Sequence, residues 1–224
     1  MIRCFFIAAT DSNTQLAIVG LESLERLIEL FKNSRDPDVE GAFLLEQYQA
    51  NISAALRSAF SVDALPHVAV RASRVAAKWL SCGVASSIND IQRVYRLMVS
   101  SLDAIRFPNS KPSNYSLKLI KMKENAMIDA WAKVFISAVE ESRQTSTVRH
   151  KEIPADGLIN LLSCELSDLK NLWNTVLADT TDITNGAECV LHASALLLNM
   201  PEYWNQAGIY RYEFSLDFSN TNKL

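Results

Sequence analysis

Apolar residues recur with a helical period along most of this 224-residue chain. Over residues 13–33, charged side chains separate six apolar residues that recur mostly at intervals of three and four: Leu16, Val19, Leu24, Leu27, Ile28 and Phe31. Apolar residues with this spacing lie along one face of an α-helix. The segment is therefore predicted to be an amphipathic helix with those six residues facing inward.

A second helix is predicted to end near residue 60. Asp36 followed by Pro37 has the form of a capping residue and a proline at the first helical position. The helical period then continues through residues 43–60, although Gly41 leaves the first residue of this helix open. The sequence therefore predicts that the helix follows the Asp36-Pro37 pair.

Proline, glycine and a capping sequence predict the ends of a third and a fourth helix. Pro66 opens the third, and Gly83 is expected to end it, because glycine is favoured just after a helix C-terminus. Residues Ser87 to Asp90 have the Ser-x-x-acid form of a capping box, which predicts that the fourth helix starts there and runs to about residue 105.

The rest of the chain divides into five parts. A loop containing Pro108 and Pro112 precedes residues 115–141, which are predicted to form one long helix or two short ones. Residues 142–153 are polar without periodicity and are predicted to be a loop. Three more helices are expected within 154–200, at about 155–164, 166–179 and 186–199, and residues 201–224 are expected to be divergent and to form a weak strand or an extended tail.

Helices joined by short loops in simple order are typical of a closed bundle or of an α-solenoid. The predicted helix pairs 13–60 and 66–105 start about 50 residues apart, near the HEAT repeat length of about 40–47 residues. Only 12 residues are glycine or proline, fewer than a β-sandwich or a Gly-rich nucleotide-binding fold needs. We predict an all-α fold, a HEAT/armadillo-like α-solenoid of antiparallel helix pairs, with HEAT-like pairs over 1–141 and further HEAT-like helices over 154–200.

Charge is distributed unevenly along the chain. The net charge is −3, yet residues 71–123 hold ten basic and only two acidic residues. If the helices stack, eight of these basic residues are predicted to form one ridge: Arg71, Arg74, Lys78, Arg93, Arg96, Lys118, Lys121 and Lys123. Such a ridge would suit an acidic peptide, an anionic membrane face or, less well, RNA. The alternative is a solvated face whose charge is balanced by acidic side chains of adjacent repeats.

No catalytic, cofactor-binding or metal-binding residue is predicted. The three histidines and four cysteines have no metal-ligand spacing, and no nucleophile elbow, P-loop or G-x-G-x-x-G sequence occurs. No apolar run reaches the length of a membrane span; the run behind Met1 is short and is expected to belong to a helix interrupted by a fragment boundary. Core packing is expected for the four tryptophans, with an aromatic groove for a partner peptide as the alternative: Trp79, Trp131, Trp173 and Trp204.

Several strings resemble the C-terminal half of the HEAT repeat-containing protein 5 family, in the same order and at similar separations. They are LLEQYQANISAALRSAF (44–60), RASRVAAKWLSCGVASSINDIQRVYRLMVSSL (71–102) and AMIDAWAKVFISAV (126–139). ELSDLKNLWNTVL (165–177) looks like a further helix of that family. The resemblance covers about residues 1–200.

The resemblance implies a segment of a large, non-enzymatic α-solenoid without cofactors. It implies traffic between endosomes and the trans-Golgi network, with clathrin-adaptor accessory proteins as partners. The protein is then expected to be cytoplasmic, and peripheral to endosomes, the Golgi and clathrin-coated vesicles, without binding nucleic acid. The alternative from the residues alone is a self-contained helical bundle that binds a small apolar ligand or serves as the helical domain of an enzyme.

Overall fold

The computed structural model describes residues 2–61, 63–85, 87–106, 115–143 and 157–178. These residues form eight α-helices and one short 3-10 helix, η1, at Glu46–Tyr48. The α-helices are α1 (Ile2–Ala9), α2 (Thr14–Phe31), α3 (Gln49–Ala59), α4 (Pro66–Ser81), α5 (Ile88–Arg106), α6 (Leu117–Arg143), α7 (Gly157–Ser163) and α8 (Leu166–Ala178). The predicted helix at 186–199 and the predicted tail at 201–224 lie outside the described residues.

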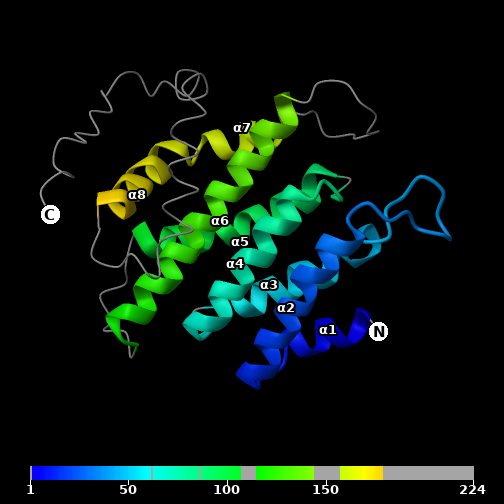
Figure 1. The fold of residues 1–224 in the computed structure, drawn as a ribbon, viewed down its shortest axis with the longest axis horizontal. Helices are drawn as coiled ribbons and strands as arrows, with labels where there is room; N and C mark the ends of the chain where they lie inside the picture. The colour runs from blue at the N-terminus through cyan, green and yellow to red at the C-terminus, as the bar shows by residue number, and fades with distance from the viewer. Residues whose placement is uncertain (1, 62, 86, 107–114, 144–156, 179–224) are drawn as a thin grey trace, which may run out of the picture.

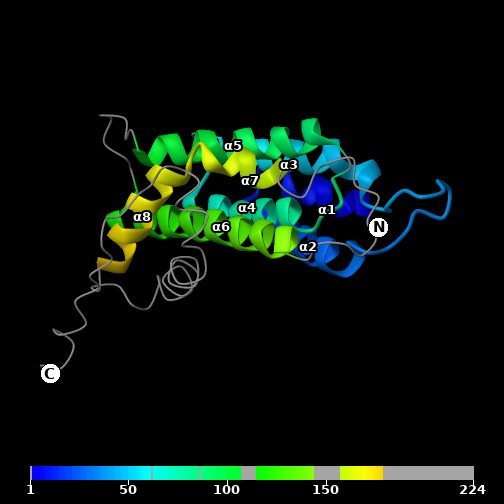
Figure 2. The same cartoon turned by 90° about the horizontal axis from the view of Figure 1, so that it is seen from above.

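The helices stack in two layers (Figures 1 and 2). A front layer consists of α2, α4 and α6, in which α4 contacts both of the others. A rear layer consists of α3 and α5, which contact each other and α4. The chain crosses from one layer to the other at each connection from α2 to α6 (Figure 2). This alternation confirms the predicted all-α solenoid of antiparallel helix pairs.

Side-chain contacts fix the register of the front layer. Two ion pairs join α2 to α4, and each links residues 49 positions apart, so the two helices run parallel. The Ser137 hydroxyl on α6 donates to the Ser81 carbonyl at the end of α4, 56 positions away. A register of about 50 residues agrees with the predicted spacing of the helix pairs, and it shows that successive front helices belong to successive repeats.

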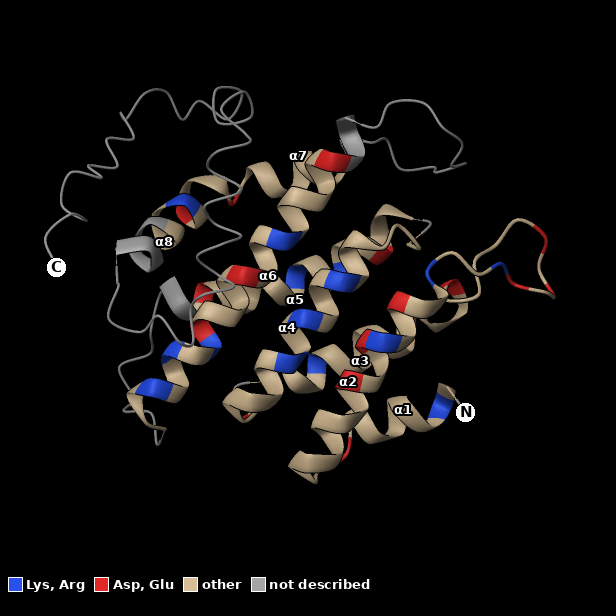
Figure 3. Cartoon of the chain, viewed as in Figure 1, with Lys and Arg blue, Asp and Glu red and all other residues tan. Residues whose placement is uncertain are grey.

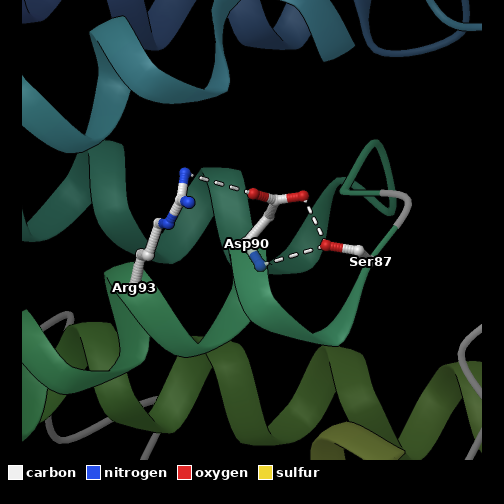
Figure 4. Close-up of polar contacts among 3 residues, drawn as sticks. All are labelled: Ser87, Asp90 and Arg93. Atoms are coloured by element: carbon white, nitrogen blue, oxygen red, sulfur yellow. Dashed lines mark hydrogen bonds and ion pairs between the residues drawn. The ribbon is translucent and has the colours of Figure 1, made fainter.

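The predicted helix boundaries around α4 and α5 are confirmed. Pro66 is the first residue of α4, and Gly83, just past its end, has a φ of +69° that a side chain would strain. At the start of α5, the Asp90 N–H donates to the Ser87 hydroxyl oxygen at 3.3 Å, and the Ser87 hydroxyl donates to the Asp90 carboxylate at 2.5 Å (Figure 4). Ser87 therefore caps the start of α5 as expected, although the Asp90 carboxylate accepts from the Ser87 hydroxyl and not from the backbone N–H that it would bind in a full capping box.

The prediction that the second helix follows Asp36-Pro37 is wrong. An Asp36 carboxylate oxygen accepts from the Asp38 N–H, which closes a side-chain turn instead of capping a helix. Arg35 and Phe43 pair across an isolated β-bridge, with the guanidinium 4.2 Å from the Phe43 ring centre. These local hydrogen bonds compete with helix formation, so residues 34–45 form a loop and η1 leads into α3.

The prediction of which residues of α2 face the core is only half right. Leu24, Leu27 and Ile28 are buried, but Leu16 and Val19 are 45% and 54% exposed. Phe31 is also exposed, at the helix end. The buried residues in the first half of α2 are instead the small ones and one leucine: Ala17, Gly20 and Leu21.

The close approach of α1 explains this rotation. Gly20 lies directly against the α1 backbone, where a Cβ atom would come 2.6 Å from the Ala8 carbonyl carbon and 2.7 Å from the Ala9 Cα. Only a residue without a side chain fits there. The face of α2 with the smallest residues therefore packs against α1, and larger apolar residues of α2 remain exposed.

Residues 115–141, predicted as one helix or two, form the single helix α6 from Leu117 onward, and α6 also includes residues 142 and 143 of the predicted polar loop. Residues 144–153 of that loop lie outside the described residues. Helices α7 and α8 agree with the helices predicted at about 155–164 and 166–179. Two aromatic side chains hold them: the Tyr95 hydroxyl donates to the Leu161 carbonyl at 2.8 Å, and the Trp173 indole N–H to the Ile128 carbonyl at 3.2 Å.

The core is continuous across the stack. Trp79, Trp131 and Trp173 are at most 1% exposed, as the sequence predicts, and each belongs to a different helix. The ring of Trp131 meets that of Tyr95 edge to face, with centroids 5.6 Å apart. Trp204 lies outside the described residues. The three tryptophans therefore pack neighbouring helices of the stack together and do not form an exposed aromatic groove.

Candidate partner-binding surfaces

The three basic residues of α4 lie beside the acidic face of α2. The Arg71 guanidinium is 2.8 Å from the Glu22 carboxylate, and the Lys78 ammonium is 3.3 Å from the Glu29 carboxylate. Arg74, between them on the same helix face, is partly buried and also has an interaction partner. Within the described residues, the charge of α4 is thus largely matched by the preceding repeat.

We expect the two ion pairs to contribute little to stability, because their side chains are about 35–57% exposed. A double-mutant cycle with Glu29→Gln and Lys78→Gln, followed by urea unfolding, should give a coupling energy of about 0.2–1 kcal/mol that falls as salt is added. The mismatched pair Glu22 and Lys78, two helical turns out of register, is the control and should give a coupling near zero. Equal coupling in both cycles would contradict the parallel register of α2 and α4.

The three residues of the predicted ridge on α6 lie in its first turns. Lys118 is exposed, whereas Lys121 and Lys123 are partly buried. Burial lowers the pKa of Lys123, against the opposing influence of the adjacent Glu124 carboxylate. Burial also raises the pKa of the Glu124 carboxyl. The positive charges of Lys121 and Lys123 act in the opposite direction and lower this pKa in part. This end of α6 therefore carries mixed charges.

Arg93 and Arg96 lie on the exposed face of α5 in the rear layer. Arg93 is 59% exposed and lies 3.5 Å from Asp90, whose other carboxylate oxygen binds Ser87 (Figure 4). Arg96 has no ion pair within the residues that the structure describes. These two arginines are therefore more available to a partner than those of α4.

The eight residues of the predicted ridge thus fall on both layers. The α4 and α6 residues belong to the front layer, in which α2 and α6 carry residues of both signs and α4 carries only basic ones (Figure 3). Arg93 and Arg96 belong to the rear layer. Stacking brings the basic residues of α4 alongside the acids of α2 and does not bring them alongside the arginines of α5.

Sequence reasoning missed one residue of the rear layer. Arg57 is exposed on α3, next to α5. It lies outside the basic stretch at 71–123 from which the ridge is predicted. The signal was present in the sequence of α3, QANISAALRSA, which contains a basic residue and no acidic one. Only the pairing of α3 with α5 connects this arginine to the other two.

The described residues contain no group of three or more His, Cys, Asp or Glu side chains placed to hold a metal ion. None of the helices in the described part of the chain is long and apolar enough to cross a membrane.

Comparisons with known proteins find similarity over most of the chain. The family model described as the Laa1/Sip1/HEATR5 HEAT repeat region matches residues 1–181. AP-1 accessory protein LAA1 of Saccharomyces cerevisiae is 30% identical over 147 residues, which are 63% of this chain and 7% of LAA1. Protein SWEETIE of Arabidopsis thaliana is 30% identical over 86 residues, or 38% of this chain and 4% of that protein. No solved structure matches the chain.

Proposed function

Because the chain belongs to the Laa1/Sip1/HEATR5 family of HEAT repeat proteins, we propose that it works as a binding scaffold in vesicle traffic between endosomes and the trans-Golgi network. In this role it binds clathrin-adaptor accessory proteins and performs no catalysis. It acts in the cytoplasm and associates with endosomes, the Golgi and clathrin-coated vesicles through its partners, as a peripheral protein. The observation that carries the proposal is the family match over residues 1–181.

The relative LAA1 supports the adaptor-related part of this proposal, since its name describes it as an accessory protein of AP-1. The matched regions are small fractions of both relatives, 7% and 4% of their lengths. The partners of the whole proteins are therefore part of the proposal for this chain.

The architecture supports a scaffold. Stacked repeats expose long surfaces on both layers. Several partners can bind to such surfaces without a conformational change of the stack. The two helix layers and the register of about 50 residues between successive front helices also favour stacked repeats over a self-contained ligand-binding bundle. The bundle alternative has no such observation in its favour.

Affinity capture tests the function. The full 224-residue chain, immobilised and incubated with cytosol, should retain clathrin-adaptor accessory proteins, identified by mass spectrometry. A chain carrying Trp131→Ala, whose stack is expected to loosen, serves as the control and should retain less. If the folded wild-type chain retains no accessory protein, the proposed function is wrong for this segment.

A further inference from the structure

We infer that the rear layer binds an acidic segment of a partner protein through the rear arginine surface, which consists of Arg57 on α3 together with Arg93 and Arg96 on α5. All three side chains are exposed, and their helices pack against each other. The inference rests on the proposed scaffold function and specifies which surface carries it and what that surface recognises.

The first supporting observation is that the exposed charges of this surface have one sign. Helix α3 contains no acidic residue. The two acidic residues of α5 are both engaged: Asp90 binds Ser87 and Arg93, and the partly buried Asp103 has an interaction partner of its own. Neither Arg57 nor Arg96 has an ion pair within the described parts of the chain.

The front layer shows the contrast. There, Arg71, Lys78 and Lys133 each form an ion pair with a carboxylate of the stack. The front helices α2 and α6 thus carry acidic as well as basic residues, whereas the acidic residues of α3 and α5 are limited to the engaged Asp90 and Asp103. Unmatched charges of one sign attract a partner of the opposite sign.

The second observation is the size of the neighbouring side chains. On the two helices that carry the arginines, most of the other exposed residues have short side chains, among them Ala50, Ala54, Asn89, Ser100 and Ala104. Small residues allow a peptide backbone to come close to the helices. The planar guanidinium groups, with two donors in parallel, fit carboxylates better than ammonium groups would.

The same composition argues against a membrane or RNA. Membrane-surface helices insert large apolar side chains, and single-stranded nucleic acids stack on aromatic rings. Among the described residues, α3 has no exposed large apolar residue, and α5 has only Ile88 at its first position. Tyr95, the one aromatic residue of these two helices, faces α7 and the ring of Trp131. An acidic protein segment is the partner class that this surface fits best.

Fluorescence anisotropy with a labelled poly-glutamate peptide and the full chain provides the direct test. The triple variant Arg57→Gln, Arg93→Gln, Arg96→Gln should bind this peptide about tenfold more weakly than the wild type. The matched control is Arg26→Gln, Lys32→Gln, Lys118→Gln, which removes three exposed positive charges elsewhere and should bind like the wild type. Added salt should weaken wild-type binding.

Several results would overturn the inference. One is a wild-type chain that does not bind poly-glutamate, and another is equal loss of binding in the two triple variants. Tighter, arginine-dependent binding to phosphatidylserine vesicles or to poly-uridine RNA would replace the acidic peptide by another class of partner. Circular dichroism and urea unfolding of both variants verify that the fold is retained, as expected for exposed positions.

Capture from cytosol with the same variants separates this inference from the proposed function. If the triple variant of Arg57, Arg93 and Arg96 retains the accessory proteins as well as the wild type does, the scaffold function stands and the proposed role of the rear arginine surface is wrong. If the wild type retains none of them but binds poly-glutamate through the three arginines, the surface stands and the proposed function fails.

Discussion

Replacement of Gly20 by alanine should destabilise the N-terminal end of the stack by about 1–3 kcal/mol. The new methyl group would lie within 3 Å of the backbone of Ala8 and Ala9, and a helix backbone cannot move aside as a flexible side chain can. Alanine in a helix interior is otherwise favoured over glycine by about 1 kcal/mol, so the two effects have opposite signs. We expect the steric effect to win, because α1 must shift as a whole.

Hydrogen exchange and urea unfolding measure this effect. In Gly20→Ala, the amides of α1 should exchange faster, while those of α4 and α6 keep their protection. Ser23→Ala, one turn further along α2 and away from this contact, is the control and should change stability by no more than about 0.5 kcal/mol. If Gly20→Ala instead increases stability, α1 does not approach α2 as closely as the structure shows.

Replacement of Trp131 by alanine should lower the free energy of unfolding by about 3–5 kcal/mol, a larger effect than that of Gly20→Ala. Its side chain is fully buried and belongs to α6, which contacts α4, α5, α7 and α8. Truncation would leave a cavity and remove the edge-to-face contact with Tyr95. The variant should therefore unfold at a markedly lower urea concentration.

Phenylalanine variants separate packing from hydrogen bonding. The buried indole N–H of Trp131 has no hydrogen-bond partner in the described structure, so Trp131→Phe loses only volume. Trp173→Phe also loses the hydrogen bond to the Ile128 carbonyl, and it should cost about 1 kcal/mol more than Trp131→Phe. If Trp131→Phe proves the more costly of the two, the indole N–H of Trp131 is hydrogen-bonded in solution.

The helices were predictable from the sequence where local signals and tertiary packing agree. Pro66 and the Ser87–Asp90 capping box act within one turn of the chain, so their effect can be read from neighbouring residues. The boundary at Asp36-Pro37 could not be predicted in this way. The carboxylate of Asp36 can either cap a helix or close a side-chain turn. The contact between Arg35 and Phe43 favours the turn.

The buried face of α2 and the matching of the basic residues on α4 depend on neighbouring helices. Periodicity alone assigned Leu16 and Val19 to the core, whereas the close contact at Gly20 turns another face of the helix inward. Likewise, the spacing of Arg71 and Lys78 showed that they share a helix face but could not show that Glu22 and Glu29 lie opposite. Both facts depend on the register between repeats. The spacing of residues within one helix carries no information about that register.

The loop between α2 and η1 offers a place to attach a reporter. Its two ends are held together, because the Leu44 N–H donates to the Ser34 carbonyl at 2.9 Å and the Asp36 N–H to the Ala42 carbonyl at 3.0 Å. Its tip projects beyond the helices at one end of the molecule, and Val39 there is 54% exposed (Figure 1). Exposed loop tips with closely spaced ends tolerate inserted sequence well. A fluorophore or epitope tag joined at this tip would report the position of the scaffold in living cells while leaving both helix layers uncovered.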